Sequence, residues 1–297
     1  MSSDSGAGTG VIHDIGFRHY EGPRLGRGYL IRSLYVDSLR GCYGLGRSGK
    51  SKIMPFLLLV VMTAPAVIIA VVAGVTGMDE LPLDYVGYIF ALSSAITIFL
   101  AAQSPATVSR DLRFRTMPLY LSRPLTRNHY VLAKYGAMST ALFILVALPQ
   151  TALFIGALLA EMEFWPNAKG WAAGLLGSFL LSLVLAGIGL LIASITPRRG
   201  FGVAAVITVL LLLTLVSGVL SALAYENDHP HLSAYFALIN PVSLVEGVLV
   251  WMVDAQSSYP EPPPGNLGGL IFTLVTVAVI AGSYALLLAR YRKVSAS

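Results

Sequence analysis

The 297-residue sequence is 56% hydrophobic and only 12% charged. A typical soluble protein has about 25% charged residues, so this chain has too few to cover a surface that faces water. The mean hydropathy is +0.73, and the apolar residues form long blocks. These features exclude a disordered chain, a collagen-like repeat and a disulfide scaffold. They indicate a membrane protein.

The rarer residue types and the first residues predict neither a metal site nor a cleaved signal peptide. Cys42 is the single cysteine, so it cannot form an internal disulfide, and we expect it to fill space rather than to react. One cysteine and five scattered histidines give no metal-ligand spacing. Residues 1–10 are small and polar, whereas a signal peptide needs an apolar core.

Six stretches reach the length of about 20 apolar residues that a helix needs to cross the hydrocarbon core. They are residues 53–75, 85–103, 133–160, 171–195, 201–224 and 267–289. The third is long enough to tilt, or to kink at Pro149. The sequence therefore predicts an all-α integral membrane protein with six transmembrane helices.

A seventh apolar stretch, residues 231–253, is interrupted by Asn240, Pro241 and Glu246. A full span there would place the end of the chain on the wrong side of the membrane. We therefore expect short re-entrant helices that dip into the outer leaflet between the fifth and sixth spans. Glu246 either lines a substrate exit or faces water at the membrane surface, and we favour the surface position.

The charged residues predict the orientation of the chain. If both termini are cytoplasmic, nineteen of the twenty Lys and Arg residues lie on the cytoplasmic side and Lys169 lies outside. Ten of the fifteen acidic residues then lie outside. This is the positive-inside pattern, and we expect a multi-pass protein of the cell (plasma or inner) membrane. The net charge of +5 follows from the topology and does not indicate nucleic-acid binding.

Residues 27–43 precede the first predicted span and have helical periodicity. Side chains with apolar character recur every three or four residues, at Leu30, Ile31, Leu34, Tyr35, Leu39 and Cys42. This is typical of an amphipathic helix that lies in the headgroup plane; an irregular cytoplasmic tail is the alternative. We divide the chain into a cytoplasmic N-terminal segment, residues 1–52, and a six-span transmembrane domain, residues 53–297.

The fourth predicted span carries a stripe of small residues at four-residue spacing. Its members are Gly170, Gly174, Ser178, Ser182 and Ala186. Such a stripe lets another helix approach closely, either inside the bundle or at a subunit interface. Chance is the alternative, because the chain has 29 glycines.

Residues 44–51 match the G-x4-G-K-[ST] pattern of nucleotide-binding loops. A true phosphate loop follows a buried strand in a soluble α/β domain, whereas here the preceding residues have helical periodicity and a membrane span follows. Only about 50 residues precede that span, too few for a nucleotide-binding domain. We therefore interpret the match as a chance one.

The loop between the second and third predicted spans is strongly basic. Ser104 is a suitable N-cap and Pro105 a suitable first-turn residue, so we expect a short separate helix from there to about residue 116, ended by Pro118. Thr126 is expected to cap the next helix. Such a preorganised helix with Arg110, Asp111, Arg113 and Arg115 suits docking onto an acidic cleft of a soluble partner. A plain positive-inside loop is the alternative.

This loop resembles that of the permease subunits of ABC-2-type ATP-binding-cassette transporters. The resemblance rests on S-R-D-L-R-x-R-T-M-P-L-Y-L-S-R-P-L-T-R-x-x-Y-V-L-A-K, from Ser109 to Lys134. The six spans, the interfacial helix and the outer re-entrant helices are also similar to that family, over roughly residues 28–290. One departure is Arg115-Thr116, where the family usually has Gly-Thr.

The resemblance implies a non-catalytic permease subunit of an exporter. The short helix would be the coupling helix that docks onto a separate ATPase subunit, and its contacts would be Ser109, Arg110, Asp111, Arg113 and Arg115. Two ATPase copies would work with two permeases, the second being another copy of this chain or a paralogue. ATP and magnesium would bind the ATPase, so no cofactor is expected on this chain.

Two other classes fit the sequence less well. An ion-coupled secondary transporter without an ATPase partner needs titratable groups within the membrane. The middle turns of the six predicted spans contain no Asp, Glu, Lys, Arg or His, since Asp84 and Lys134 lie at the edges. A membrane-embedded enzyme would need paired acids, a metal cluster or a nucleophile motif, and the sequence has none near a span.

Overall fold

The computed structural model describes residues 22, 25–78, 80–113, 125–196, 198–255, 257 and 261–294, without the side chains of residues 110, 112, 113, 293 and 294. Every regular element within these residues is helical, which confirms the all-α fold class. The elements are α1 Arg27–Cys42, α2 Lys50–Thr76, α3 Tyr85–Ala91, α4 Ser93–Arg113, α6 Arg127–Leu159, α7 Phe164–Ile195, α8 Arg199–Glu226, α9 Pro230–Phe236, the 3-10 helix η1 Ala237–Ile239, α10 Pro241–Val253 and α11 Gly265–Val294.

Five of the helices are long and apolar enough to cross a membrane: α2, α6, α7, α8 and α11. A sixth span is present if α3 and α4 together form one span, although they meet at an angle of 56°. The span predicted over residues 85–103 is therefore not one straight helix in the structure. The helix breaks at Leu92, whose backbone leaves helical geometry just before the serine pair Ser93-Ser94, and serine pairs are common kink sites.

The expected separate helix beginning at Ser104 is also wrong, because α4 continues through Ser104 and Pro105 to Arg113. Glycines on the two neighbouring helices explain the difference. A Cβ on Gly189 of α7 would lie 2.6 Å from the Ser104 hydroxyl, and one on Gly202 of α8 would lie 2.8 Å from Pro105 Cγ. Close packing on two flanking helices therefore outweighs the local signals for a helix start. Thr126 does cap α6, since its Oγ1 accepts from the His129 N–H at 3.4 Å.

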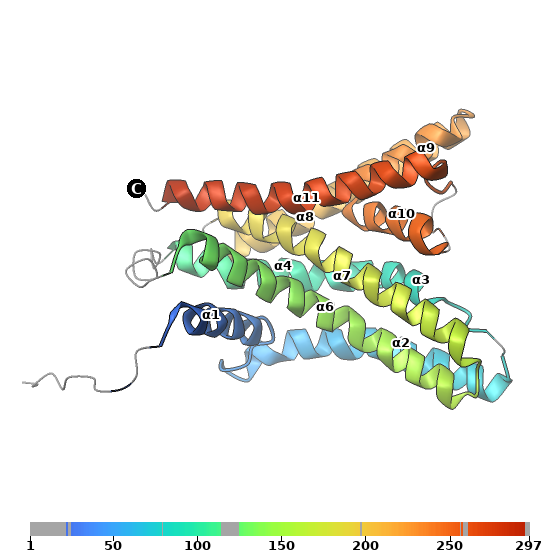
Figure 1. The fold of residues 1–297 in the computed structure, drawn as a ribbon, viewed down its shortest axis with the longest axis horizontal. Helices are drawn as coiled ribbons and strands as arrows, with labels where there is room; N and C mark the ends of the chain where they lie inside the picture. Colours follow the sequence, from blue (N-terminus) through green and yellow to red (C-terminus); the bar gives the residue numbers. More distant parts are fainter. Residues whose placement is uncertain are drawn as a thin grey trace, which may run out of the picture.

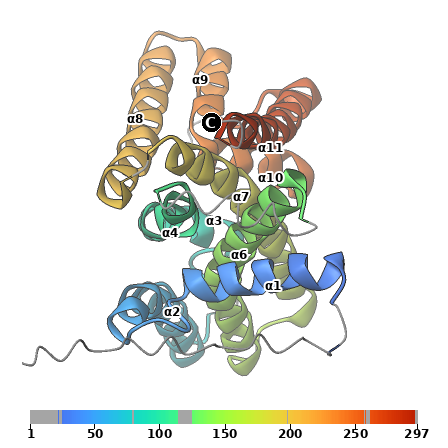
Figure 2. The ribbon, with the colours of Figure 1, turned by 90° about the vertical axis from the view of Figure 1, so that its left-hand side faces the viewer.

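The long helices run in broadly the same direction, and α1 lies across one end of them (Figures 1 and 2). The C-terminal end of α11 lies at that same end (Figure 1). Most described cations also belong to the elements that meet there: Arg27, Arg32, Arg40, Arg47, Lys50, Lys52, Arg127, Lys134, Arg198, Arg199, Arg290 and Arg292. We call this the basic end. Lys169, near the start of α7, lies toward the opposite end. The side of the membrane that the basic end faces stays a prediction.

The expected helix before the first span is present as α1, and it packs against α6 and α4. Leu34, Ser38 and Cys42 are its buried residues. Tyr35 donates a hydrogen bond to Thr140 Oγ1 at 2.8 Å, and Tyr43, just after α1, donates one to Ala141 O at 2.8 Å. These bonds fasten α1 across α6, while its position in a headgroup plane stays a prediction.

Short helices occupy the seventh apolar stretch, as expected. α9 packs along α8, where Ser221 and Ser233 each donate a hydrogen bond to the other's carbonyl oxygen. The chain turns at Asn240, whose side chain caps α10, and α10 packs on α7 and α11. Glu246 is only 3% exposed there, so the expectation that it faces water is wrong. How these helices sit in a bilayer stays a prediction.

The small-residue stripe of α7 lies against other helices of the same chain. A Cβ on Gly170 would meet the Tyr85 ring of α3 at 2.8 Å, and one on Gly174 would meet Gln150 Oε1 of α6 at 2.6 Å. Gln150 donates a hydrogen bond to the Ser178 hydroxyl at 2.9 Å. Ser178, Ser182 and Ala186 are buried. The small residues thus let α3 and α6 approach α7 closely.

Candidate functional site at the basic end

Four of the five residues expected to contact a partner, Ser109, Arg110, Asp111 and Arg113, lie in the last turns of α4. The side chains of Ser109 and Asp111 face the bundle. Arg110 and Arg113 belong to α4, but their side chains are not described, and Arg115 lies outside the described residues. Ser109 is 2% exposed, and its hydroxyl lies 3.1 Å from the carbonyl oxygens of both Ala193 and Thr196. This residue therefore joins α4 to the end of α7.

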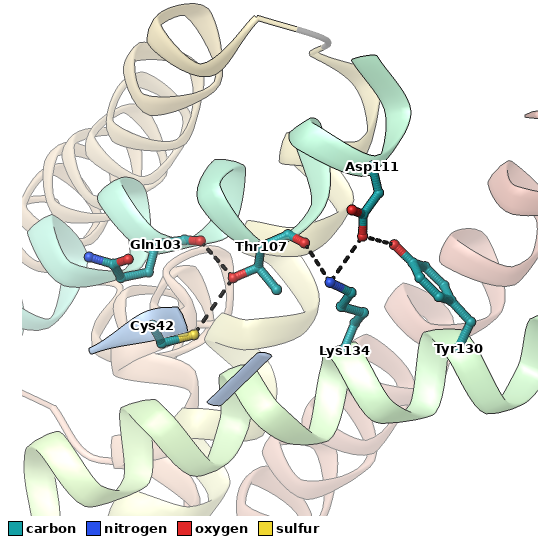
Figure 3. Close-up of polar contacts among 6 residues, drawn as sticks. All are labelled: Cys42, Gln103, Thr107, Asp111, Tyr130 and Lys134. Atoms are coloured by element: carbon teal, nitrogen blue, oxygen red, sulfur yellow. Dashed lines mark hydrogen bonds and ion pairs between the residues drawn. The ribbon is translucent and has the colours of Figure 1, made fainter. Parts of the chain in front are cut away.

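A largely buried ion pair joins α4 to α6. Lys134 Nζ lies 3.0 Å from Asp111 Oδ2, and the two side chains are 10% and 15% exposed. Tyr130, one turn before Lys134 on α6, donates a hydrogen bond to the same carboxylate oxygen at 2.6 Å. Lys134 also donates to the carbonyl oxygen of Thr107 at 3.0 Å. We call Thr107, Asp111, Tyr130 and Lys134 the Asp111 network (Figure 3).

The network extends to α1 through Thr107. Its hydroxyl donates to Gln103 O at 2.8 Å and lies 3.6 Å from Cys42 Sγ (Figure 3). Because the hydroxyl proton of Thr107 is donated to Gln103 O, the Cys42 thiol is the donor in the contact with Thr107. Burial raises the pKa of Cys42, and the smaller lowering effects of Thr107 and nearby cations do not reverse this. Cys42 is therefore a neutral thiol at pH 7.

The network also contacts α11. The Tyr130 ring packs edge-on against Tyr291, with ring centroids 5.2 Å apart. Lys134 Nζ lies 5.6 Å from the centroid of the Tyr130 ring, within reach of a cation–π interaction. Four helices, α1, α4, α6 and α11, thus meet around one ion pair at the basic end. A displacement of the end of α4 must move these neighbours or break charged hydrogen bonds.

Breaking the ion pair between α4 and α6 costs free energy. Removing one partner of a buried pair leaves an uncompensated charge, which costs about 3–5 kcal/mol. The Asp111 carboxylate also accepts from Tyr130, and the Lys134 ammonium also donates to a carbonyl oxygen. Both charges are therefore held by more than their mutual attraction.

The importance of Lys134 and Tyr130 was not predicted. The sequence places Lys134 only at the edge of a span, and Asp111 only among the charged residues of the loop helix. The residue spacing gave one indication of this network. Thr107 lies four residues before Asp111, and Tyr130 lies four residues before Lys134, so the members of each pair share a helix face. An acid and a base lie on those two faces, on either side of the same loop.

The same region falls within a match to a known family. The sequence profile of the ABC-2 family transporter proteins matches residues 78–288, most of the chain. The chain belongs to this family. The match runs from just before α3 to near the end of α11 and so includes the Asp111 network, whereas α1 and α2 precede it. A comparison with curated proteins gave no match.

Membership of the ABC-2 family agrees with the helices that the structure shows. The chain is a multi-pass membrane protein with five to six candidate spans, and the family profile is that of a membrane component of ABC transporters. The resemblance found in the loop sequence is therefore confirmed at the level of the family.

Proposed function

We propose that this chain is the permease subunit of an ABC-2 exporter and works with a separate ATPase subunit. Family membership and the candidate spans support a permease. ATP and magnesium would bind the ATPase, and this chain would carry no catalytic residue. The working unit would hold two ATPase copies and two permeases, with the basic end in the cytoplasm.

The end of α4 is the proposed docking element for the ATPase. Arg110 and Arg113 lie in its last turns and Arg115 follows them in the sequence. Three cations within six residues suit an acidic groove on a soluble partner. Ser109 and Asp111 would hold this element against the bundle rather than reach the partner with their side chains, because both are engaged internally.

The Asp111 network is the observation that carries this proposal. Closure of the ATPase would push the end of α4, and the ion pair with Lys134 would pass that movement to α6. The Ser109 contacts would pass it to α7, and Thr107 to α1. Rigid-body repacking of spans is an established way to open a pathway.

ATP hydrolysis by the reconstituted complex tests this proposal. The complex is purified from native membranes, placed in liposomes, and compared with the double variant Arg110→Glu/Arg113→Glu. We expect the variant chain to insert normally but to lose stimulation of its ATPase, because charge reversal opposes docking. The matched control is Arg27→Glu/Arg32→Glu, which reverses two exposed charges of α1 at the same end. Normal stimulation by the α4 variant would refute the docking assignment.

A further inference from the structure

A pocket of about 300 Å³ lies at the basic end, between the loop that joins α1 to α2, the side of α4 and the first residue of α8. We call it the loop pocket. Its lining includes Gly44, Arg47, Lys50, Ser51, Gln103 and Arg199. The loop is the segment that matches the nucleotide-binding pattern, residues 44–51, and the proposed function gives it no role.

The loop has a defined shape. Gly44 has a φ of +68°, and a Cβ there would lie 2.4 Å from the carbonyl oxygen of Ser51, so only glycine fits. The Leu45 N–H donates to Arg40 O at 2.8 Å, and the Arg47 N–H donates to Gly44 O at 3.3 Å. The loop therefore folds back on the first turn of α2, and its cations line the pocket.

The charges of the pocket favour an anion. Arg47, Lys50 and Arg199 line it, and the described lining residues include no carboxylate. None of the three forms an ion pair with another described residue. Three cations around one pocket attract a negative group. No side chain caps the N-terminus of α8, so its dipole adds to the positive potential.

Apolar surface begins within one turn of these cations. Ile53 follows Lys50 on α2 and is 62% exposed, and Phe201 follows Arg199 on α8 and is 66% exposed. On candidate membrane spans, such side chains face acyl chains. A molecule that satisfies both surfaces has a negative group joined to hydrocarbon, and in a bilayer an anionic phospholipid has both.

We propose that the loop pocket binds the phosphate group of an anionic phospholipid, whose acyl chains lie against α2 and α8. The site does not depend on the proposed ATPase coupling, because it uses neither the arginines of α4 nor the Asp111 network. The loop would then share two features with a nucleotide-binding loop, namely glycine turns and cations near a phosphate. It would lack the nucleotide-binding domain.

Native mass spectrometry of the full chain in mild detergent tests this proposal, with short-chain phosphatidylglycerol as the probe. The variant Arg47→Gln/Lys50→Gln/Arg199→Gln removes the charges of the pocket. We expect its affinity for the probe to fall roughly 100-fold, or about fivefold for each cation. The single variant Lys50→Gln changes only an exposed side chain and is expected to lose about fivefold.

The matched control is Arg32→Gln/Arg40→Gln/Lys52→Gln, which removes three exposed cations of the basic end that do not line the pocket. We expect this variant to bind phosphatidylglycerol as the wild type does. Equal binding by the pocket variants and the wild type would overturn the proposal, as would equal losses in the pocket and control triple variants.

Competing ligands identify the source of the phosphate. We expect phosphatidylcholine to bind much more weakly, because its choline brings a positive charge to a positive pocket. Millimolar inorganic phosphate or ATP should leave the bound phosphatidylglycerol in place, because neither can use the apolar surface of α2 and α8. Displacement by either would overturn the lipid assignment and indicate a site for a soluble phosphate.

Discussion

Replacing Lys134 with methionine removes one charge of the Asp111 network and keeps a side chain of similar length. The substitution breaks the 3.0 Å contact with Asp111 and the 3.0 Å hydrogen bond to Thr107 O. The Asp111 carboxylate then keeps its hydrogen bond from Tyr130 but loses the ammonium group that balances its charge. We expect the free energy of unfolding to fall by about 3–5 kcal/mol, the usual cost of breaking a buried pair from one side.

A double-mutant cycle separates the ion pair from the other contacts of these side chains. Asp111→Asn, Lys134→Met and the double variant are unfolded in mixed detergent micelles, and the free energies of unfolding are compared. Because the double variant leaves no charge unpaired, it should cost at least ~1.5 kcal/mol less than the sum of the single variants. Lys52→Met, at an exposed cation with no ion pair to a described residue, is the control and should change stability by less than ~0.5 kcal/mol.

Additive effects in that cycle would refute the reasoning, since they would show that Asp111 and Lys134 do not interact in the folded protein. A stabilised Lys134→Met variant would refute it as well. The same variants also separate the stability of the chain from its coupling to the ATPase. We expect the double variant to fold but to stimulate ATP hydrolysis by its ATPase partner less than the wild type does.

Three smaller changes test other parts of the structure. Gly156→Ala should cost about 1–3 kcal/mol of stability, because its Cβ would lie 2.2 Å from the Cβ of Ala70, whereas Gly218→Ala, with nothing within 4 Å, should be nearly neutral. Tyr130→Phe should cost about 1.5–3 kcal/mol through the lost bond to a charged carboxylate, measured by the same unfolding assay. Burial raises the pKa of Cys42, so iodoacetamide should modify it much more slowly than a free thiol at pH 8, and faster as the pH rises or the chain unfolds; rapid modification of the folded chain at pH 7 would contradict its burial.

Hydropathy predicted the long helices because the hydrocarbon core of a bilayer offers no water to the backbone. A run of about 20 apolar residues there forms a helix, in which its N–H and C=O groups bond to each other. The predicted ranges 53–75 and 201–224 therefore fall within α2 and α8. The break at Leu92 was not predicted, since the sequence around it is apolar enough for a continuous helix. Only the backbone geometry at Leu92 shows that the second span is bent.

The error at Ser104 has a different cause. Serine followed by proline is a strong local signal for a helix start, but Gly189 and Gly202 bring two helices against that segment and keep α4 continuous. Those glycines are distant in the sequence, so the local pattern could not reveal them. The Asp111–Lys134 pair was missed for the same reason. It depends on how α4 and α6 pack side by side, which the sequence of either helix alone does not show.

Purification of the tagged chain from its native membranes in mild detergent tests the central claim most directly. Mass spectrometry of the eluate measures whether a soluble ATPase is present in stoichiometric amount. We predict that such an ATPase copurifies with the wild-type chain and with Arg27→Glu/Arg32→Glu, and that it is lost from Arg110→Glu/Arg113→Glu. A well-folded preparation that contains no ATPase would contradict the assignment as a permease subunit of an ATP-driven exporter.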